Sequence, residues 1–320
     1  MIDPVASNNP VPGRAFQRVL LAVDGTEASV RAAEYVNALF AGETQIALVS
    51  VVQNPHTLFP LGAKARNVLA AARDELLQDA RTALDAIEAM FSDARPETEL
   101  VELSKRNGDT VQALLDIAAR WRADLVVMGA RHHHGLLRWV EGTVSEPVTQ
   151  RTGCSLLLVP ENSRVPTNRR PGRIVFALDG SVHSLIALRM GLQFAVEDTE
   201  LRAVYVLDRA VHLFDFAPVD VLENAFLEEG RTVLELATRI FAEHRWSAKT
   251  ALIETNRAND DVPHAIVRDA QRWNADLLVV GTHGRRGLAR WFMGSVAART
   301  LRLADTPVLL ARAPEVEQAP

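Results

Sequence analysis

The sequence predicts an α/β protein of two similar, Rossmann-like, doubly wound domains, each a parallel sheet with helices on both faces. Two observations carry this prediction: the second half of the chain repeats the first, and short apolar runs alternate with helical patterns in each half. The apolar runs, such as 125–128, lack the alternation typical of strands with one wet face, which favours strands covered on both sides. The 320 residues suffice for about two domains of ordinary size.

The repeat is strongest around one strand of each half and the loop that follows it. Segment 121–129 (WRADLVVMG) matches 273–281 (WNADLLVVG), and the match continues without a gap to Gly142 and Gly294. A period near half the chain indicates a duplicated domain, because solenoid units are far shorter. Segment 160–171 is rich in Pro, Asn and Arg, which is the composition of an exposed linker. We therefore expect a flexible N-terminus at 1–15, domains at 16–160 and 173–312, a linker at 161–172, and a tail at 313–320.

The elements of the first half follow from β-branched and leucine-rich runs separated by helical patterns. Residues 18–23 (RVLLAV) form such a run and stop at Asp-Gly, where a helical pattern begins. Right-handed crossovers would join the parallel strands. We expect strands at 18–23, 45–52, 98–104, 125–129 and 155–159, and helices at 28–40, 65–91, 110–120 and from 143.

The second half repeats this order of elements. Its apolar runs have the same character, and 173–178 (RIVFAL) again stops at Asp-Gly. We expect its strands at 173–178, 202–207, 249–254, 277–281 and 308–311.

Composition and charge exclude several classes of protein. Hydrophobic residues make up 48% and charged residues 23%, which excludes a disordered or collagen-like chain. A net charge of −5 argues against nucleic acid as a partner, because phosphate binding needs a basic surplus. Cys154 is the only cysteine, so neither an intrachain disulfide nor a cysteine metal cage can form. The chain lacks the apolar runs of a signal peptide or a membrane span, and we expect a soluble, cytoplasmic protein with no membrane partner.

Acidic residues and glycines stand where an open parallel sheet binds ligands, beyond the carboxyl ends of its strands. Asp24 and Asp179 follow the first strand of each half, and Gly281 begins a Gly-Thr-His-Gly sequence. Nine residues later, Gly294 and Ser295 precede a helix. Glycine amides and a helix N-terminus can together bind phosphate. The alternative, that these glycines only shape a loop between strand and helix, stays open.

This pattern of Gly-x-x-Gly, nine residues, then Gly-Ser/Thr, with Asp-Gly-Ser after the first strand, resembles that of the universal stress protein family. The duplication resembles the tandem form of the family, over nearly the whole chain. The resemblance implies five parallel strands per domain in the order 3-2-1-4-5, and antiparallel pairing of 155–159 with 306–311. It also implies that ATP binds with the strand-one Asp near adenine and ribose, a second-strand backbone group on adenine, and the glycine loop on the phosphates.

Residue by residue, the resemblance implies one set of nucleotide-binding positions in each half. The sequence itself predicts neither catalytic nor metal-binding residues. The first set is Ala22, Asp24, Ile46, Met128, Gly129, His132, Gly142, Thr143, Val144 and Ser145, and the second is Ala177, Asp179, Leu201, Val280, Gly281, His283, Gly284, Gly294, Ser295 and Val296. Two departures rank the second set above the first. His132 replaces the second glycine in the first half, whereas the second half loses only a hydroxyl, because Ala297 stands where the first half has Ser145.

The resulting hypothesis is an ATP-binding regulator or protector in the stress response, with or without Mg²⁺ on the nucleotide. Nucleotide occupancy would order the glycine loop and change a surface that an unidentified protein partner contacts. A homodimer of tandem chains is left open. So are two alternatives, a scaffold that binds no nucleotide, and an enzyme that adenylates a substrate or slowly hydrolyses ATP. The sequence contains no catalytic signature such as Gly-x-Ser-x-Gly, which favours a slow ATPase at most.

Other chemically suggestive residues have structural interpretations. The run 131–134 (RHHH) could bind zinc or nickel, but nothing is spaced to complete such a site, and we predict a solvated loop. Arg285 and Arg286 either cover a triphosphate or face solvent. Cys154 has no activating base in the sequence, so we predict a packed thiol. Four tryptophans at equivalent positions of the two halves are expected to pack as loop, core or rim residues: Trp121, Trp139, Trp273 and Trp291.

Overall fold

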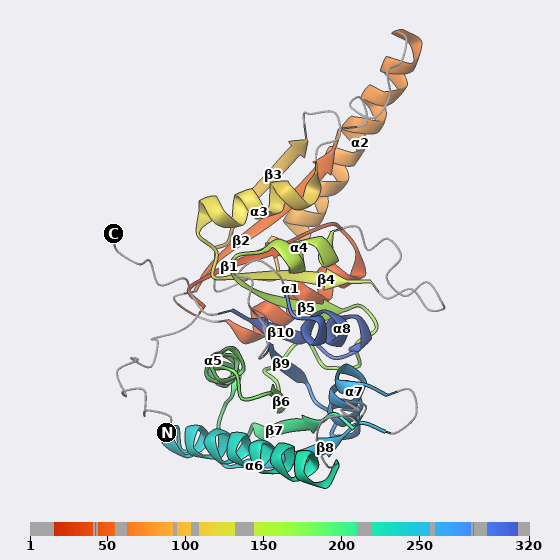
Figure 1. Cartoon of the computed structure of the whole chain (residues 1–320). Coiled ribbons are helices and arrows are strands. Elements are labelled where there is room, and N and C mark those ends of the chain that lie inside the picture. Colours follow the sequence, from red (N-terminus) through yellow and green to blue (C-terminus); the bar gives the residue numbers. More distant parts are fainter. Residues whose placement is uncertain are drawn as a thin grey trace, which may run out of the picture.

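The chain folds around one continuous ten-stranded sheet with helices on both faces (Figure 1). The computed structural model describes residues 16–40, 42, 44–54, 63–91, 95–103, 109–131, 144–209, 219–256, 260–282, 284 and 293–312. Its strand order is β3-β2-β1-β4-β5-β10-β9-β6-β7-β8. Each half therefore has its five strands in the predicted order 3-2-1-4-5, which confirms the predicted fold.

The elements of the first half agree with the expected ones to within a few residues. The largest difference is at α2, which ends at Glu88 rather than at 91, and α4 begins at Ser145 rather than at 143. The elements are β1 (Arg18–Ala22), α1 (Glu27–Leu39), β2 (Gln45–Gln53), α2 (Ala63–Glu88), β3 (Glu97–Leu103), α3 (Thr110–Trp121), β4 (Leu125–Ala130), α4 (Ser145–Arg151) and β5 (Ser155–Pro160).

The second half repeats this order and adds a short 3-10 helix, η2, after its first α-helix. The elements are β6 (Arg173–Leu178), α5 (Val182–Gly191), η2 (Leu192–Phe194), β7 (Glu200–Leu207), α6 (Val219–Glu243), β8 (Ala248–Glu254), α7 (Val262–Arg272), β9 (Leu277–Gly281), α8 (Ser295–Leu303) and β10 (Val308–Ala311).

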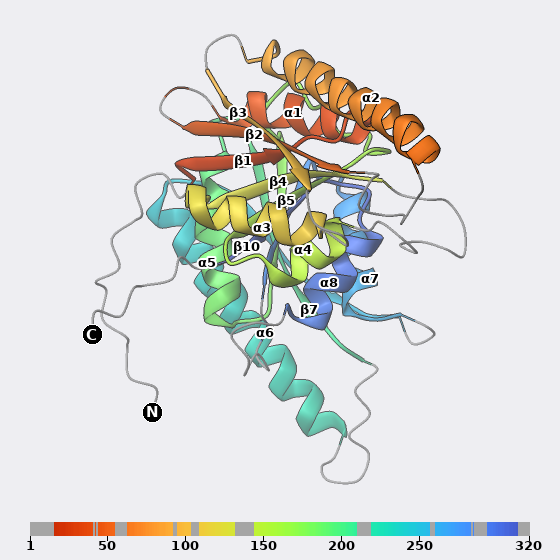
Figure 2. The same cartoon turned by 90° about the horizontal axis from the view of Figure 1, so that it is seen from above.

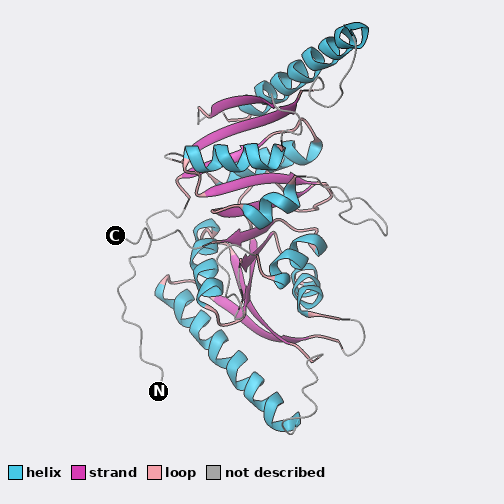
Figure 3. Ribbon diagram, turned by 45° about the horizontal axis from the view of Figure 1, so that its top comes forward, coloured by secondary structure: helices cyan, strands magenta, loops and turns pink. Residues whose placement is uncertain are grey.

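Both faces of the sheet are buried, as the continuous apolar runs predict. Along β1, Val19 and Leu21 belong to one core and Leu20 to the other, because successive side chains of a strand point to opposite faces. The first core lies under α1, α2, α5 and α6, and the second lies under α3, α4, α7 and α8. Figures 2 and 3 show these helices on the two sides of the twisted sheet.

The two halves meet at an antiparallel seam between β5 and β10, as predicted. Leu157 pairs with Leu309, and both side chains are fully buried. The other strand pairs of the sheet are parallel. This pairing covers one edge strand of each half, which would otherwise expose unpaired backbone groups.

Aromatic side chains and a buried hydroxyl reinforce the contact between the halves. The Phe194 ring, from η2, stacks on Phe16 at a centroid distance of 5.5 Å and meets Phe40 edge to face at 5.6 Å. Tyr35 on α1 donates a 3.2 Å hydrogen bond to the Asp276 carbonyl, just before β9. Burial raises the pKa of Tyr35 well above its ordinary value, so this hydroxyl stays neutral.

The segment between the halves lies against α1 instead of forming an exposed tether. Arg31 donates hydrogen bonds of 2.7 and 3.0 Å to the carbonyls of Ser163 and Val165. The Thr167 hydroxyl donates to Glu34, and the Thr167 residue is only 6% exposed. Side chains of the first half therefore hold this segment in place, which its Pro-rich and polar composition did not predict.

The repeated Trp-x-Ala-Asp sequence has a structural role at the amino end of the sheet. Asp124 accepts hydrogen bonds from the N–H groups of Gln17 and Arg18, where β1 starts. Asp276 accepts in the same way from Gly172 and Arg173, where β6 starts. The guanidinium of Arg18 lies 5.0 Å from the Trp121 ring centre, and that of Arg173 lies 6.0 Å from the Trp273 ring centre. These two tryptophans are partly buried at the rim of the core, which agrees with the expectation that they pack as core or rim residues.

Candidate functional site

The candidate site of each half lies beyond the carboxyl ends of its first and fourth strands. β1 lies between β2 and β4, and β6 lies between β7 and β9, so strand order reverses at these points. Because the halves are joined by an antiparallel pair, the strands of one half run in the direction opposite to those of the other. The carboxyl ends of the two sets of strands therefore lie on opposite sides of the molecule. Each half therefore has its own site rather than a share in a common one.

In the first half, Asp24 organises the turn from β1 into α1. Its Oδ1 accepts hydrogen bonds from the Thr26 N–H at 3.1 Å and the Thr26 hydroxyl at 2.6 Å. Thr26 in turn caps α1 by accepting from the Ser29 N–H. Asp24 Oδ2 lies 3.4 Å from an Arg131 guanidinium nitrogen. Both side chains are more than half exposed, so this ion pair contributes about 1 kcal/mol at most.

In the second half, Asp179 organises the same turn, but a glycine approaches its outer oxygen. Its Oδ1 accepts from the Ser181 N–H at 2.9 Å and the Ser181 hydroxyl at 2.6 Å. A Cβ built on Gly284 would lie 2.9 Å from Asp179 Oδ2, closer than real Cβ contacts come. The absence of a side chain at Gly284 thus lets the loop after β9 reach the strand-one carboxylate.

Gly129 and Gly281 serve the packing of the fold. A Cβ on Gly129 would lie 2.3 Å from the carbonyl carbon of Ala28, in the first turn of α1. A Cβ on Gly281 would lie 3.0 Å from the carbonyl carbon of His183 in α5. These glycines let the helix after the first strand approach the end of the fourth strand. The structural interpretation of the glycines therefore holds at these two positions.

A backbone hydrogen bond joins the two ends of the segment between β9 and α8, and no side chain caps α8. The Gly294 N–H donates a 2.8 Å hydrogen bond to the Thr282 carbonyl at the end of β9. Gly294 is the N-cap of α8, and no side chain there accepts from the first-turn amides. Ser295 and Val296 are exposed on this turn, and Ala297 is buried. Unpaired amides and the helix dipole make this end suited to an anion.

The first half differs at this helix start. Its α4 begins two residues later, at Ser145, with Val144 as an N-cap that provides no side-chain hydrogen bond. Ser145 and Val144 are half-buried. Four predicted positions lie outside the described residues: His132, Gly142, Thr143 and His283. So do the histidines 133 and 134 and the residues Trp139, Arg285, Arg286 and Trp291.

Apolar side chains on one face of the sheet lead up to each site. Ala22 and Met128 belong to the core beneath α3 and α4, and Ala177 and Val280 belong to the same core beneath α7 and α8. They precede Asp24, Gly129, Asp179 and Gly281 along their strands. Their side chains therefore form the apolar base below each strand-one carboxylate.

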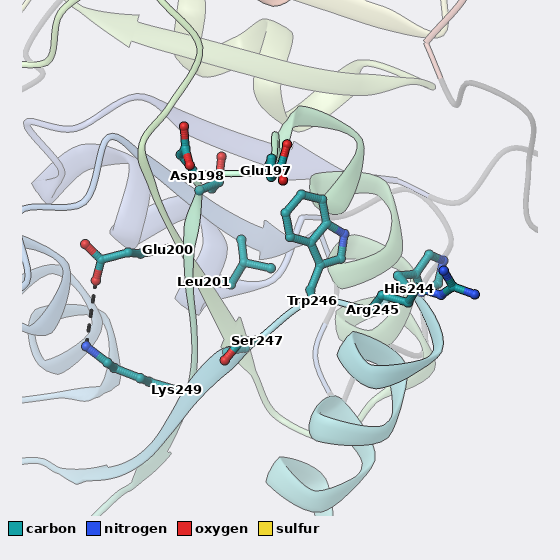
Figure 4. Close-up of a pocket in the computed structure, with 11 residues that line it drawn as sticks. Glu197, Asp198, Glu200, Leu201, His244, Arg245, Trp246, Ser247 and Lys249 are labelled. Carbon is teal, nitrogen blue, oxygen red and sulfur yellow. Dashed lines mark ion pairs between the residues drawn. The ribbon is translucent and has the colours of Figure 1, made fainter.

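The structure does not bring Ile46 and Leu201 to these sites. Ile46 pairs with Val19, five residues before Asp24, which places it about 16 Å away along the strand. Leu201 pairs with Ile174 and lines a cavity at the opposite end of the sheet (Figure 4). Both predicted placements are wrong, because they follow the beginning of the second strand rather than its end.

The strand register identifies the second-strand residues that sequence reasoning missed. Ala22 pairs with Val49, so the same register two residues further on places Val51 near Asp24. Leu178 pairs with Tyr205, so one residue further on it places Val206 near Asp179. Both valines are partly buried and pack against the core on the site's face of the sheet. The rule that ligands bind at the carboxyl ends of strands directs attention to the end of each second strand, and the register then selects these two valines.

Beside the second site, Asp261 connects the two helices that follow β8 and β9. It caps α7, with Oδ1 accepting from the His264 N–H at 3.0 Å and lying 2.7 Å from His264 Nδ1. Its Oδ2 lies 2.8 Å from Arg299 on α8. Partial burial by itself raises the pKa of Asp261, but the hydrogen bonds from His264 and the charge of Arg299 outweigh it. The net pKa of Asp261 lies below its ordinary value.

We expect Asp261→Ala to lower the free energy of unfolding by about 1 kcal/mol at pH 7, the usual effect of removing an N-cap. Because the folded-state pKa is depressed, this contribution is complete above the unfolded pKa of about 4 and is lost as pH falls through the folded pKa. Urea unfolding at pH 7 and about pH 3 measures it. Asp85→Ala, an exposed position on α2, is the control. A difference that stayed constant down to pH 3 would contradict the assignment.

Cys154 is a packed thiol in this structure, as expected. Burial raises its pKa above the ordinary value, while a contact of 3.3 Å with the Thr152 hydroxyl acts in the opposite direction. Among the residues that the structure describes, no group of three His, Cys, Asp or Glu side chains is arranged to hold a metal ion. No helix in the described ranges has the length and apolar character needed to cross a membrane.

Two half-sheets are joined through their last strands, and each has a carboxylate after its first strand, at the point where strand order reverses. This architecture is that of a tandem α/β protein. The model of the Universal stress protein family matches residues 15–160 and 171–312. The chain belongs to the universal stress protein family, in its two-domain tandem form.

Known proteins resemble this chain both in one domain and over its whole length. It is 35% identical over 150 residues to a universal stress protein of Methanocaldococcus jannaschii, covering 45% of this chain and 84% of that protein. It is 25% identical over 303 residues to one of Mycolicibacterium smegmatis, covering 92% and 96%. The crystal structure of a universal stress protein from Archaeoglobus fulgidus has the same fold, with a TM-score of 0.63 at 18% identity, covering 92% and 98%.

Proposed function

We propose that this protein is an ATP-binding regulator or protector in the stress response and that its second half holds the nucleotide. One observation carries this proposal: Gly284 brings the loop after β9 against the carboxylate of Asp179. A strand-one carboxylate and a main-chain loop thus meet at the switch point, where doubly wound sheets bind their ligands.

The described residues fit the parts of an adenine nucleotide. The uncapped start of α8 at Gly294 and the backbone at Gly284 would hold phosphates through N–H groups. Asp179 would accept hydrogen bonds from ribose hydroxyls. The backbone at the end of β7, near Val206, would contact the adenine edge above Val280. ATP with or without Mg²⁺ matches this arrangement of an anion site, a carboxylate and an apolar base.

The first half favours a different role, as a scaffold with little affinity for nucleotide. Its strand-one carboxylate, Asp24, contacts Arg131. Its sequence has His132 where the second half has Gly284. A side chain at that position would not allow the close backbone approach that the second half has at Gly284. We therefore propose one high-affinity nucleotide site per chain, with the first half available to a protein partner.

Isothermal titration of the full chain with ATP and Mg²⁺ tests the proposal. We expect micromolar binding with a stoichiometry near one, and a loss of roughly 10- to 100-fold in affinity for Gly284→Leu. The loss corresponds to one hydrogen bond to a charged group, at about 1.5 to 3 kcal/mol. Gly153→Leu is the matched control, because a Cβ there meets nothing within 4 Å.

Three outcomes would contradict the proposal: no heat from the wild-type chain, an unchanged affinity in Gly284→Leu, or an equal loss in Gly153→Leu. Circular dichroism of each variant checks that the fold persists. Release of ADP or of an adenylated product above the buffer rate would support the enzyme alternative. Unreacted nucleotide retained through purification would support the regulatory role. Absence of binding in both halves would leave the scaffold alternative.

A further inference from the structure

A cavity lies at the opposite end of the second half from Asp179, and Figure 4 shows the residues that line it. Its volume is about 640 Å³, within the range of small-molecule sites. It opens between the turn that precedes β7 and the turn that precedes β8. Because these parallel strands begin here, the cavity is at the amino end of the sheet. Among the described residues, neither Asp179 nor Gly284 lines it.

Trp246 forms an aromatic wall of this cavity, and the end of α6 fixes its position. The Trp246 N–H donates to the Phe241 carbonyl at 2.9 Å, and the Arg245 N–H donates to the Ala242 carbonyl at 3.0 Å. Arg245 is in the left-handed region, at φ 60°. These bonds form a Schellman motif, in which the residue after the left-handed one packs back on the helix. The indole is consequently half-buried and positioned before any ligand arrives.

Carboxylates occupy the facing turn, which is equally well fixed. The Thr199 N–H donates to the Val196 carbonyl at 2.7 Å, so Glu197 and Asp198 stand at the tip of the turn. The buried Thr199 hydroxyl accepts from the Val196 N–H and donates to the Pro171 carbonyl. In the described part of the chain, neither Glu197 nor Asp198 has an ion-pair partner. Figure 4 shows both carboxylates on the side of the cavity above the indole.

The basic side chains around the cavity are directed elsewhere or already paired. His244 Nδ1 lies 2.9 Å from the Ile240 carbonyl of its own helix. Figure 4 shows Arg245 pointing away from the indole, on the outer side of the cavity. Lys249 lies 3.7 Å from Glu200 in an exposed ion pair. The charge that faces the indole is therefore negative.

We propose that this cavity binds an organic cation, of the class of linear alkylammonium compounds with two or more charges. One ammonium group would lie over the Trp246 ring, where the ring quadrupole attracts cations. The carboxylates of Glu197 and Asp198 would accept its hydrogen bonds. A second ammonium group would replace Lys249 beside Glu200. An anion fits less well, because it would meet the two unpaired carboxylates.

Titration of the full chain with spermidine at low salt, without nucleotide, tests this assignment. We expect saturable binding that an uncharged diol of similar length does not reproduce. The double variant Glu197→Gln/Asp198→Asn should bind at least 10-fold more weakly, and Trp246→Leu about 3- to 10-fold more weakly. Lys249→Ala should bind more tightly, because it removes one of the two cations, Lys249 and Arg173, that pair with Glu200. Glu235→Gln, at an exposed position on α6, is the matched control and should leave affinity unchanged.

Four results would overturn the proposal: no binding at millimolar spermidine, full affinity in the double variant, weaker binding in Lys249→Ala, or the same loss in Glu235→Gln. Weaker binding in Lys249→Ala would mark an anion site, and a loss in Glu235→Gln would indicate bulk attraction. The double variant keeps the shape of both side chains, so it tests the charges even where Trp246→Leu loosens the fold. Gly284→Leu should bind spermidine normally, which separates this cavity from the nucleotide site.

Discussion

The Gly129→Ala variant is expected to lose about 3 kcal/mol or more of unfolding free energy, although it adds a single methyl group. The new Cβ would lie 2.3 Å from the Ala28 carbonyl carbon and 2.4 Å from its oxygen. Both atoms belong to the backbone of α1, so no side chain can rotate away, and the helix itself must shift. Overpacking of this kind costs about 1 to 3 kcal/mol of stability. Because the neighbouring atoms here belong to a rigid helix backbone, we expect a cost at or above the top of that range. Urea unfolding monitored by circular dichroism measures the change.

Gly281→Ala is the matched control at the equivalent position of the second half. Its Cβ would lie 3.0 to 3.1 Å from the α5 backbone, so we expect a loss of only about 1 kcal/mol. Gly153→Ala meets nothing within 4 Å and should change stability by less than about 0.5 kcal/mol. A Gly129→Ala chain as stable as Gly281→Ala would show that α1 moves freely, contrary to the packing described.

Replacement of Phe194 by alanine should remove about 3 to 5 kcal/mol of stability and weaken the coupling between the halves. The Phe194 residue is only 2% exposed and contacts the rings of Phe16 and Phe40, which belong to the first half. Loss of a buried Phe leaves a cavity that the surrounding core fills only in part. Because its aromatic partners are in the other half, we expect calorimetry to show two separated unfolding transitions.

Phe241→Ala serves as the control for that experiment. Phe241 is 1% exposed and contacts Phe176 within the second half, at a ring distance of 5.6 Å. Its loss should destabilise the second half by a similar amount and leave the contacts between the halves in place. If Phe194→Ala unfolds with the same ratio of van't Hoff to calorimetric enthalpy as Phe241→Ala, the aromatic cluster does not couple the halves.

The fold was predictable because its signals are local and occur twice. Apolar runs such as 125–128 and 277–280 have the length and character of buried strands wherever they lie in the chain. The positions of Asp24 and Asp179 after the first strands followed from the same runs. The order of the strands and their pairing across the seam came from the resemblance to a family, because propensity contains no information about which strands become neighbours.

The candidate site was predictable in part. Asp179 and Gly284 lie close together beyond the carboxyl ends of their strands, but Ile46 and Leu201 are at the other end of theirs. The position of a residue along a neighbouring strand depends on register, which hydrogen bonds between strands set. Only the paired sheet shows that Val51 and Val206 are level with the acidic residues.

The amino-acid sequence by itself determined the duplication, the alternation of strands and helices, and the acidic residue at the end of each first strand. These features depend on neighbours in the chain and on the period of apolar side chains. Tertiary structure alone decided that Gly129 permits helix packing, that Arg31 holds the segment between the halves, and that Trp246 lines a cavity together with Glu197 and Asp198. Each of these depends on atoms far apart in sequence, whose distance is set by how the helices and the sheet pack.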